Sequence, residues 1–239
     1  MSSLVLCYIT DRRQLKSVPL AVIMRETLRA GVDMLQIREK DLLTPELMAL
    51  VEEAVVAARE FPPAVPVSRP PHRHDEPTHR SVILSETKDL RSRLSAHSRV
   101  LVNDRLDVAM AAGAGGVHLG GQSMPVSAVR QVAPRPIVIG ASCHSFSEAS
   151  AAESGGADYL LFGPVFETPS KLKYGPPVGL DALRKVAAEI RVPVLALGGI
   201  TMERVRPCLE AGAAGIAGIR IFQDCELMEA LVGELRAQG

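Results

Sequence analysis

The 239-residue sequence predicts an α/β protein that folds as a single (β/α)8 barrel, the TIM barrel. Three observations support this prediction. Short apolar runs alternate with longer amphipathic stretches, the same joint recurs between helix-like and strand-like segments, and the length suits one barrel domain. Strands alternating with helices indicate parallel βα units, and eight such units favour a closed barrel. The predicted domain spans residues 1–239, with 62–98 as an inserted loop.

Eight short apolar runs are the expected strands. They are Leu4–Ile9, Met34–Ile37, Val100–Val102, Gly116–Leu119, Ile137–Ile139, Tyr159–Phe162, Val194–Leu197 and Gly215–Ile221. Runs of this kind are typical of parallel strands that are covered on both faces. Because the chain has no tryptophan and few other aromatic residues, its core must consist of Val, Ile, Leu, Ala and Met.

The clearest predicted helix covers Thr44–Arg59. Thr44 is suited to cap this helix, and Pro45 is suited to its first position. Six apolar residues recur at three- and four-residue spacing and share one helix face. They are Leu47, Leu50, Val51, Ala54, Val55 and Ala58.

One joint recurs four times between a predicted helix and the following strand. Its copies are Ala30-Gly31-Val32-Asp33, Ala112-Gly113-Ala114-Gly115, Gly155-Gly156-Ala157-Asp158 and Ala211-Gly212-Ala213-Ala214. The second residue is always glycine, which suits a left-handed conformation after the end of a helix. We therefore expect these glycines to turn the chain into the next buried strand.

The segment Pro62–Ser98 interrupts the alternation. It is rich in proline, arginine and histidine, and it lies where the second helix should lead directly into the third strand. We interpret it as a long, poorly ordered insertion. His72, His74 and His79 offer metal-ligating side chains, but a solvated loop is the simpler interpretation. Deleting Pro66–His97 is accordingly expected to leave melting behaviour and activity nearly unchanged.

The overall composition excludes several classes of partner. Lysine plus arginine equals aspartate plus glutamate at 27 each, so no global charge attracts nucleic acid or a membrane surface. No run approaches the ~20 apolar residues of a membrane helix, and no signal-peptide pattern is present. The four cysteines form no CxxC pair. We expect a reduced, cytoplasmic protein, and a homo-oligomer is compatible with the sequence.

The end of the second predicted strand carries a cluster of long polar side chains. Alternation along a strand points Gln36, Arg38 and Lys40 to the same side. At the mouth of a barrel they would form a clamp for an anion, since arginine offers a planar fork and lysine a point charge. The alternative is a solvated row of salt bridges with Glu39 and Asp41.

Polar residues also follow the third and fourth predicted strands. Asp104, after Asn103, faces two phosphate-binding cations, where a carboxylate is the usual partner of Mg²⁺. Alternatively, Asp104 only caps the following helix, Arg105–Ala112. His118 is more simply explained as a hydrogen-bonded structural residue than as a catalyst.

The loop after the fifth strand contains a histidine and three serines. His144 lies in a polar loop and is the better candidate for an acid or base. Ser142, Ser145 and Ser147 are each able to cap the helix that begins near Glu148.

Phosphate-binding features follow the last three strands. Thr168, Ser170 and Lys171 suit a phosphate or diphosphate, in a loop long enough to act as a lid. Gly198-Gly199 follows strand seven, and Ile219-Arg220 ends strand eight. Many barrels hold a phosphate there with glycine N–H groups and a helix N-terminus. The alternative for the two glycines is a tight turn only.

These motifs, in this order, resemble the family of thiamine-phosphate synthase and thiazole tautomerase. The resemblance rests on Tyr8–Arg12, Gln36–Asp41, Asn103–Arg105, Gly116–Gly120, Gly140–His144, Ala157–Lys171, Leu197–Thr201 and Gly212–Ala217. It covers essentially the whole chain except Pro62–Ser98. It implies condensation of hydroxymethylpyrimidine diphosphate with thiazole phosphate, which releases diphosphate.

The resemblance also implies roles for individual residues. The residues implied for the pyrimidine diphosphate are Gln36, Arg38, Glu39, Lys40, Asn103, Ser142 and Lys171. Those implied for the thiazole phosphate are Thr168, Ser170, Gly199, Ile219 and Arg220. Arg38, Lys171 and His144 are the catalytic candidates. Asp104 would bind Mg²⁺, the implied cofactor.

Two positions depart from the family pattern. Ser123 stands where a synthase usually carries a second metal-binding aspartate, and a hydroxyl is a poorer ligand for Mg²⁺. Arg220 replaces a small hydroxyl residue, but its side chain is still able to bind phosphate. Two alternatives follow from these departures: a metal-independent thiazole tautomerase that uses His144, and a catalytically idle barrel that binds thiamine precursors.

Overall fold

The computed structural model describes residues 4–16, 18–62, 90, 99–133, 136–168 and 176–239. In these residues, eight parallel strands form a closed barrel in chain order, and the last strand pairs with the first. The strands are β1 (Val5–Ile9), β2 (Met34–Ile37), β3 (Val100–Asn103), β4 (Gly116–Leu119), β5 (Val138–Cys143), β6 (Tyr159–Phe162), β7 (Val194–Leu197) and β8 (Gly215–Gly218). The predicted barrel is confirmed.

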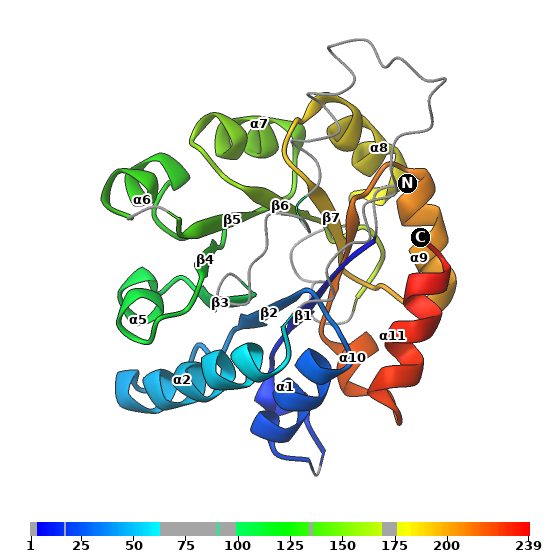
Figure 1. The fold of residues 1–239 in the computed structure, drawn as a ribbon. Coiled ribbons are helices and arrows are strands. Elements are labelled where there is room, and N and C mark those ends of the chain that lie inside the picture. Colours follow the sequence, from blue (N-terminus) through cyan, green and yellow to red (C-terminus); the bar gives the residue numbers. More distant parts are fainter. Residues whose placement is uncertain (1–3, 17, 63–89, 91–98, 134–135, 169–175) are drawn as a thin grey trace, which may run out of the picture.

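Helices form a ring around the strands (Figure 1). They are η1 (Arg12–Gln14), α1 (Leu20–Arg29), α2 (Thr44–Glu60), α5 (Leu106–Ala111), α6 (Val126–Val132), α7 (Phe146–Ser154), α8 (Gly179–Glu189), α9 (Met202–Glu210), α10 (Arg220–Gln223) and α11 (Met228–Ala237). None of the helices in the described ranges is long and apolar enough to cross a membrane.

Some predicted boundaries are wrong. Strand β5 continues beyond Ile139 to Cys143, because its last residues still pair with β6. Strand β8 ends at Gly218, since α10 follows almost immediately. Thr44 is the first residue of α2 and not its cap: the N-cap is Leu43, whose N–H donates to the Glu46 carboxylate at 3.1 Å.

Side chains alternate between the barrel interior and the layer under the helices. In β1, Val5, Cys7 and Ile9 belong to the interior cluster, whereas Leu6 and Tyr8 belong to the larger cluster beneath the helices. The interior cluster also contains Met34, Leu101, Tyr159, Leu161, Leu195 and Ala217. The interior is therefore a packed core, and the chemistry must lie at an end of the barrel.

The glycines of the recurring joint have the predicted left-handed conformation. Gly31, Gly113, Gly156 and Gly212 have φ values of 90°, 69°, 92° and 92°. Residues that carry a Cβ atom rarely adopt these backbone angles. Glycine is therefore needed where each helix turns into the next strand.

The aspartate at the end of two of these joints fixes the neighbouring strand. Asp158 accepts a hydrogen bond from the N–H of Ile139 at 2.8 Å and pairs with Arg130, which also donates to the carbonyl of Gly156. At the other joint, Asp33 accepts a hydrogen bond from the N–H of Leu6 and pairs with Arg236, which also donates to the carbonyl of Gly31. One charged contact thus joins a helix, a turn and a strand at each place.

Arg99 lies directly before β3 and is completely buried. Its guanidinium donates to the backbone carbonyls of Asp33 and Val32, after α1, and of Phe61, after α2. Carbonyl groups at helix ends need such donors when they are buried. This arginine therefore holds the start of β3 beneath the ends of two helices.

The segment predicted as an insertion lies mostly outside the described residues, including His72, His74 and His79. Leu90 is described, and it is 1% exposed within the interior cluster of the barrel. A solvated loop does not account for this position. The predicted insertion does lie between α2 and β3, and Leu90 within it packs in the core.

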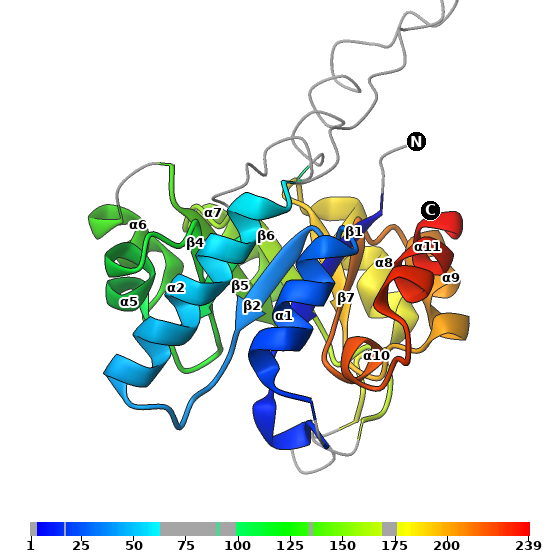
Figure 2. The same ribbon diagram turned by 60° about the horizontal axis from the view of Figure 1, so that its bottom comes forward.

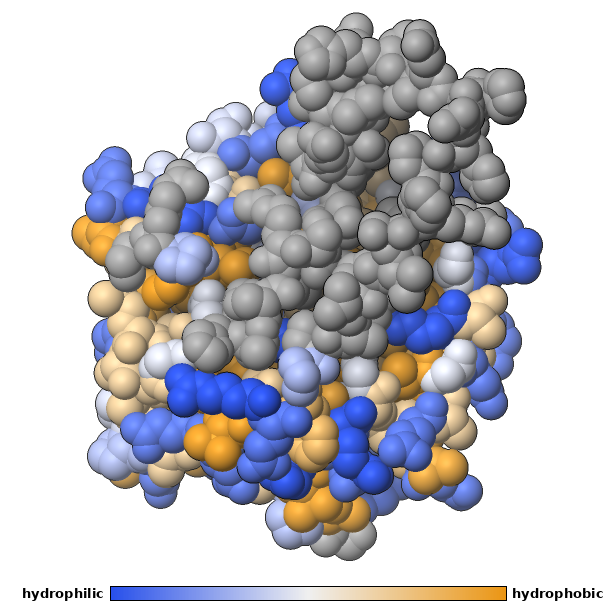
Figure 3. Space-filling model, viewed as in Figure 1, coloured by the Kyte–Doolittle hydropathy of each residue, from blue (hydrophilic) through white to orange (hydrophobic). Residues whose placement is uncertain are grey.

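The two ends of the barrel have different roles. In Figure 2, α10 lies towards the lower edge, and the C-terminus, after α11, lies at the upper edge. Figure 3 shows the end of the barrel near the C-terminus, where hydrophilic and hydrophobic side chains are interspersed around the rim. The site described below belongs to the opposite, C-terminal end of the strands.

Candidate active site

A layer of polar side chains covers the apolar interior at the C-terminal end of the strands. Gln36 and Asn103 each follow an interior residue by two positions, so they point into the barrel. The Gln36 amide nitrogen donates to the Asn103 side-chain oxygen at 3.0 Å. Gln36 is 2% exposed, and its own side-chain oxygen has no hydrogen-bond partner among the described residues. A buried acceptor of this kind is suited to a ligand N–H group.

Arg38 and Lys40 continue the same side of β2 beyond the strand. The backbone N–H of Arg38 donates to the Thr10 hydroxyl at 3.0 Å, and Arg38 is half-buried. Among the residues that the structure describes, none forms an ion pair with the Arg38 guanidinium. The Lys40 ammonium lies 3.7 Å from the Asp104 carboxylate. The alternative interpretation, a salt-bridge row of Arg38 and Lys40 with Glu39 and Asp41, is therefore wrong.

Glu39 lies on the other side of the same segment. Its carboxylate accepts from the backbone N–H of Arg12 at 3.1 and 3.2 Å and pairs with the Arg12 guanidinium at 3.2 Å. Its side chain is 2% exposed. These contacts fully engage Glu39 with the loop after β1, so it does not join Arg38 and Lys40.

Asp104 has a left-handed backbone, with a φ of 62°. Such a conformation is uncommon for residues other than glycine, and functional sites often contain one. It turns the carboxylate towards β4, where it accepts from the Gly120 N–H at 3.2 Å and from the Ser123 hydroxyl. Asp104 does not cap the next helix, because Arg105 occupies the N-cap of α5.

Opposing effects act on the ionisation of Asp104. Partial burial acts to raise its pKa, but hydrogen bonds from Ser123 and Gly120 and the charge of Lys40 outweigh it and lower the pKa. The carboxylate therefore stays ionised. It lines a cavity of about 240 Å³ together with Glu39, Lys40, Asn103 and Arg105. An anionic oxygen beside a cation at a cavity wall is suited to a metal–phosphate complex.

His118 and Tyr159 form the floor of this polar layer. One imidazole nitrogen of His118 is hydrogen-bonded to the Tyr159 hydroxyl at 2.9 Å, and the other to the Ser142 hydroxyl at 2.8 Å. A Cβ at Gly140 would come within 2.1 Å of the Tyr159 ring, so only glycine fits there. As expected from the sequence, His118 is hydrogen-bonded, here through both ring nitrogens. Ser142 belongs to β5 and does not cap α7.

Burial keeps His118 neutral. Removal from water is the largest effect and lowers the pKa of His118 to about 3, and the charge of Arg38 acts in the same direction. An unfolded histidine has a pKa near 6.5, so the unfolded chain binds one more proton between about pH 6.5 and pH 3. Stability is therefore complete above about pH 6.5 and is lost as the pH falls.

We expect the free energy of unfolding to decrease by roughly 1 kcal/mol per pH unit between pH 6.5 and 5. The His118→Gln variant should be less stable at neutral pH but should lack this slope. Urea denaturation at several pH values measures both quantities. The same slope in His118→Gln would show that another group causes the acid sensitivity.

His144 follows β5 and is 45% exposed. Its backbone N–H donates to the Glu148 carboxylate at 2.7 Å, and its imidazole lies 3.6 Å from the same carboxylate. Ser145 is the N-cap of α7 and accepts from the Glu148 N–H. Of the three serines considered as caps, Ser145 is therefore the one that the structure selects.

The loop after β6 is fastened to the end of β7. The N–H of Phe166 donates to the Gly198 carbonyl at 3.1 Å, and Arg204 lies over the Phe166 ring. Gly198 and Gly199 both have positive φ, and a Cβ at Gly199 would come within 2.6 Å of a neighbouring carbonyl. No described backbone hydrogen bond uses the Gly199 N–H. Thr168 is half-buried, whereas Ser170 and Lys171 lie outside the described residues.

At the end of β8, the Arg220 side chain forms an ion pair, and its backbone belongs to the first turn of α10. Its guanidinium pairs with Asp224 at 3.3 Å, one turn along α10, and is 66% exposed. Ile219 is the N-cap of α10 and packs against the interior cluster. The first N–H groups of α10 thus lie at the C-terminal end of the barrel.

Two parts of this site were not predicted from the sequence. Tyr159 is placed against His118 by the pairing of β5 and β6, and within an apolar run it carries no recognisable signal. The engagement of Glu39 and Asp41 by Arg12 joins residues 27 and 29 positions apart. Only the neighbouring positions of β1 and β2 in the barrel bring them together.

Comparison with known proteins agrees with this arrangement. A family model described as thiamine monophosphate synthase matches residues 75–222. A thiamine-phosphate synthase of Chlorobium luteolum is 36% identical, over 98% of this chain and 92% of the relative. The chain belongs to the thiamine monophosphate synthase family. The family resemblance seen in the sequence is thus confirmed.

Further relatives of this family member cover the barrel almost completely. A thiamine-phosphate synthase of Methanospirillum hungatei is 37% identical over 82% of this chain and 79% of the relative. A solved thiamine phosphate pyrophosphorylase of Pyrococcus furiosus superposes with a TM-score of 0.76 at 33% identity. That superposition covers 99% of this chain and 96% of the other. The likeness therefore extends to both ends of the described barrel.

Proposed function

We propose that this family member is a thiamine-phosphate synthase, a transferase that condenses hydroxymethylpyrimidine diphosphate with thiazole phosphate. One observation carries the proposal beyond family membership: Lys40 lines a cavity with Asn103, and the charge of Arg38, which forms no ion pair among the described residues, acts on the neighbouring His118. A site that presents cations next to a hydrogen-bonding floor is suited to a heterocycle with a diphosphate. The substrates are small phosphorylated heterocycles, and nucleic acid is not a partner.

In this reaction the protein must stabilise diphosphate as the leaving group. The bond between the pyrimidine methylene carbon and the diphosphate oxygen breaks, and its electron pair leaves with diphosphate. The thiazole nitrogen then donates its lone pair to the resulting carbocation. Arg38 and Lys40, with Lys171 from outside the described residues, would neutralise the developing negative charge. Fixed positions for both heterocycles would supply the alignment.

Hydrogen bonds at the barrel floor would hold the pyrimidine. Gln36 offers its unpaired side-chain oxygen, and Asn103 is oriented by the Gln36 amide. Ser142 is held in turn by His118. Because these groups are fixed before any ligand binds, little order must be gained when the ring enters.

The second phosphate would bind between β7 and β8. The Gly199 N–H and the first N–H groups of α10, after Ile219, supply donors, and Thr168 and Ser170 supply hydroxyls. The guanidinium of Arg220 pairs with Asp224, so its contribution would come from the backbone unless that pair opens.

The residues present fit Mg²⁺ only together with a phosphate. No group of three or more His, Cys, Asp or Glu side chains is placed to hold a metal in the ranges that the structure describes. Mg²⁺ is nonetheless often bound by one or two carboxylates with water and substrate phosphate oxygens. Asp104 would be that carboxylate, and the ion would supply positive charge to the diphosphate.

Ser123→Asp is expected to lower the Mg²⁺ concentration for half-maximal activity by about tenfold, because it adds a carboxylate beside Asp104. The Ser123 hydroxyl already contacts that carboxylate, so the new group would lie at the metal position. A Mg²⁺ titration of the initial rate measures the change. Ser127→Asp, in α6, is the control. An unchanged midpoint in Ser123→Asp would place the metal elsewhere.

The decisive assay mixes both phosphorylated precursors with and without Mg²⁺ and oxidises any thiamine phosphate to fluorescent thiochrome. Mg²⁺-dependent product supports the synthase. Absence of product from verified substrates would favour a thiazole tautomerase, for which the contact of His144 with Glu148 is the relevant observation. Binding without either reaction would indicate an idle barrel. The four cysteines are free, which is consistent with a cytoplasmic location.

A further inference from the structure

The segment that carries the phosphate-binding cations also carries two acids. Arg38 and Lys40 alternate with Glu39 and Asp41. Carboxylates this close in the sequence are the nearest competitors of a phosphate for the two cations. The structure shows where these carboxylates go instead.

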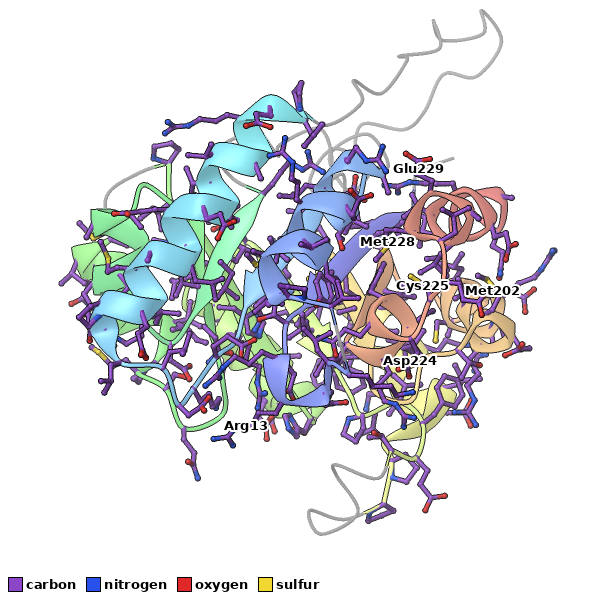
Figure 4. The ribbon with its side chains drawn as sticks, turned by 90° about the horizontal axis from the view of Figure 1, so that it is seen from below. Arg13, Met202, Asp224, Cys225, Met228 and Glu229 are labelled. Carbon is purple, nitrogen blue, oxygen red and sulfur yellow. The ribbon has the colours of Figure 1, made fainter. Side chains whose placement is uncertain are left out.

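Arg12 binds both acids. Its guanidinium forms a bidentate pair with Asp41, at 2.6 and 2.7 Å, and also contacts Glu39 at 3.2 Å. Its backbone N–H donates to the same Glu39 carboxylate. Arg13 adds a contact to Asp41 at 2.8 Å. Figure 4 shows Arg13 at one edge of the molecule, far from Glu229 at the start of α11.

These contacts affect ionisation in a consistent way. Hydrogen bonds from Arg12 lower the pKa of Asp41, and the hydrogen bonds of Asp41 raise the pKa of Arg12. Both side chains therefore stay charged throughout the neutral range. The planar arginine fork is needed for this geometry, since an ammonium group offers no parallel pair of donors.

The backbone of the segment is fixed from the same loop. The N–H of Thr10 donates to the Gln36 carbonyl at 2.9 Å, and the Thr10 hydroxyl accepts from the N–H of Arg38. Residues 10–12 thus hold the segment at Gln36, Arg38 and Glu39. With Glu39 held on one side, strand alternation directs Arg38 to the other side.

We infer that Arg12 is a positioning residue for the diphosphate site: it engages the carboxylates of Glu39 and Asp41, so that neither acid pairs with Arg38 or Lys40. This inference rests on the proposed function and extends it. It also gives Glu39 a role different from the substrate contact predicted from the sequence. Glu39 binds Arg12, and Arg12 acts on the substrate only through the neighbouring cations.

The test measures binding of inorganic diphosphate, with Mg²⁺ at fixed concentration, by calorimetry. Arg12→Gln should weaken this binding about tenfold, because the released carboxylates then compete for Arg38 and Lys40. Arg12→Lys keeps the charge but loses the fork, and it should give an intermediate value. Arg184→Gln removes a comparable exposed pair with Asp181 on α8 and should bind like the parent protein.

A second variant separates positioning from general damage. Arg12→Gln/Asp41→Asn removes the charge of one released acid and should recover at least a third of the lost affinity. KM for the diphosphate substrate should follow the same order, while KM for thiazole phosphate stays within about twofold. Loss of folding alone would affect both substrates and would not be recovered by neutralising Asp41.

Distinct outcomes overturn the two proposals. If the parent protein forms no thiamine phosphate and binds no diphosphate, the proposed function fails. If the parent protein does both and folded Arg12→Gln binds diphosphate equally well, the inference about Arg12 fails alone. It also fails if Asp41→Asn brings no recovery in the Arg12→Gln background. Should Arg12→Gln not fold, Arg12→Lys provides the same comparison.

Discussion

Arg38→Ala is expected to lower kcat/KM for the pyrimidine diphosphate by about 100-fold. Arg38 is half-buried, its charge acts on the buried His118 of the polar layer, and it forms no ion pair among the described residues, so its charge is available to the leaving group. Negative charge increases on the diphosphate as the carbon–oxygen bond breaks. The loss should therefore appear in kcat as well as in KM.

Steady-state thiochrome kinetics measure this effect, and Arg206→Ala is the matched control. Arg206 is 74% exposed on α9 and pairs with Glu210, so its removal should leave both constants unchanged. Circular dichroism and thermal melting establish that each variant is folded. Parent-like kinetics in folded Arg38→Ala would mean that diphosphate leaves from another part of the barrel.

The barrel itself was predictable because the apolar runs and the recurring glycine joint both indicate alternating parallel strands and helices. The apolar runs have the length of parallel strands, and glycine recurs where every described copy of the joint has positive φ. The errors concern boundaries. Strand β5 reaches Cys143 because its ladder with β6 continues through the small residues from Gly140 to Cys143, which form only a weak apolar run.

The candidate site was predictable where one strand is enough to place the residues. Alternation along β2 put Gln36, Arg38 and Lys40 on one side. This alternation does not indicate with which residue each charged side chain pairs, because the pairing residues lie on or after other strands. Arg12 takes Glu39 and Asp41 only because β1 and β2 are neighbours, with Ile9 opposite Gln36. Similarly, the left-handed φ of Asp104 is invisible in its sequence neighbourhood.

The predicted insertion shows why amino-acid composition does not identify a single buried residue. Composition describes the average of a segment, and residues 62–98 are polar and rich in proline on average. A single apolar residue that reaches the core leaves that average almost unchanged. Leu90 is such a residue, because it lies in the interior cluster with Val5, Cys7 and Met34. Those three residues are separated from it by more than 50 positions along the chain.

Leu90→Ala should accordingly lower the free energy of unfolding by about 2–5 kcal/mol, through lost apolar burial and the cavity that remains. Chemical denaturation measures this change, and Leu227→Ala is the control, since Leu227 is 61% exposed. The deletion of residues 66–97, which composition alone suggests to be harmless, should lower stability by a similar or larger amount.

Two further results separate the contribution of Leu90 from that of the rest of the segment. Leu90→Met keeps most of the volume in the core and should cost less than about 1.5 kcal/mol. The variant Leu90→Ala should retain kcat, because the interior cluster lies below the polar layer that would hold the substrates. Equal stability of Leu90→Ala and Leu227→Ala would contradict a core role. The segment would then fit the solvated loop that its composition predicts, and the barrel interior would be stable without it.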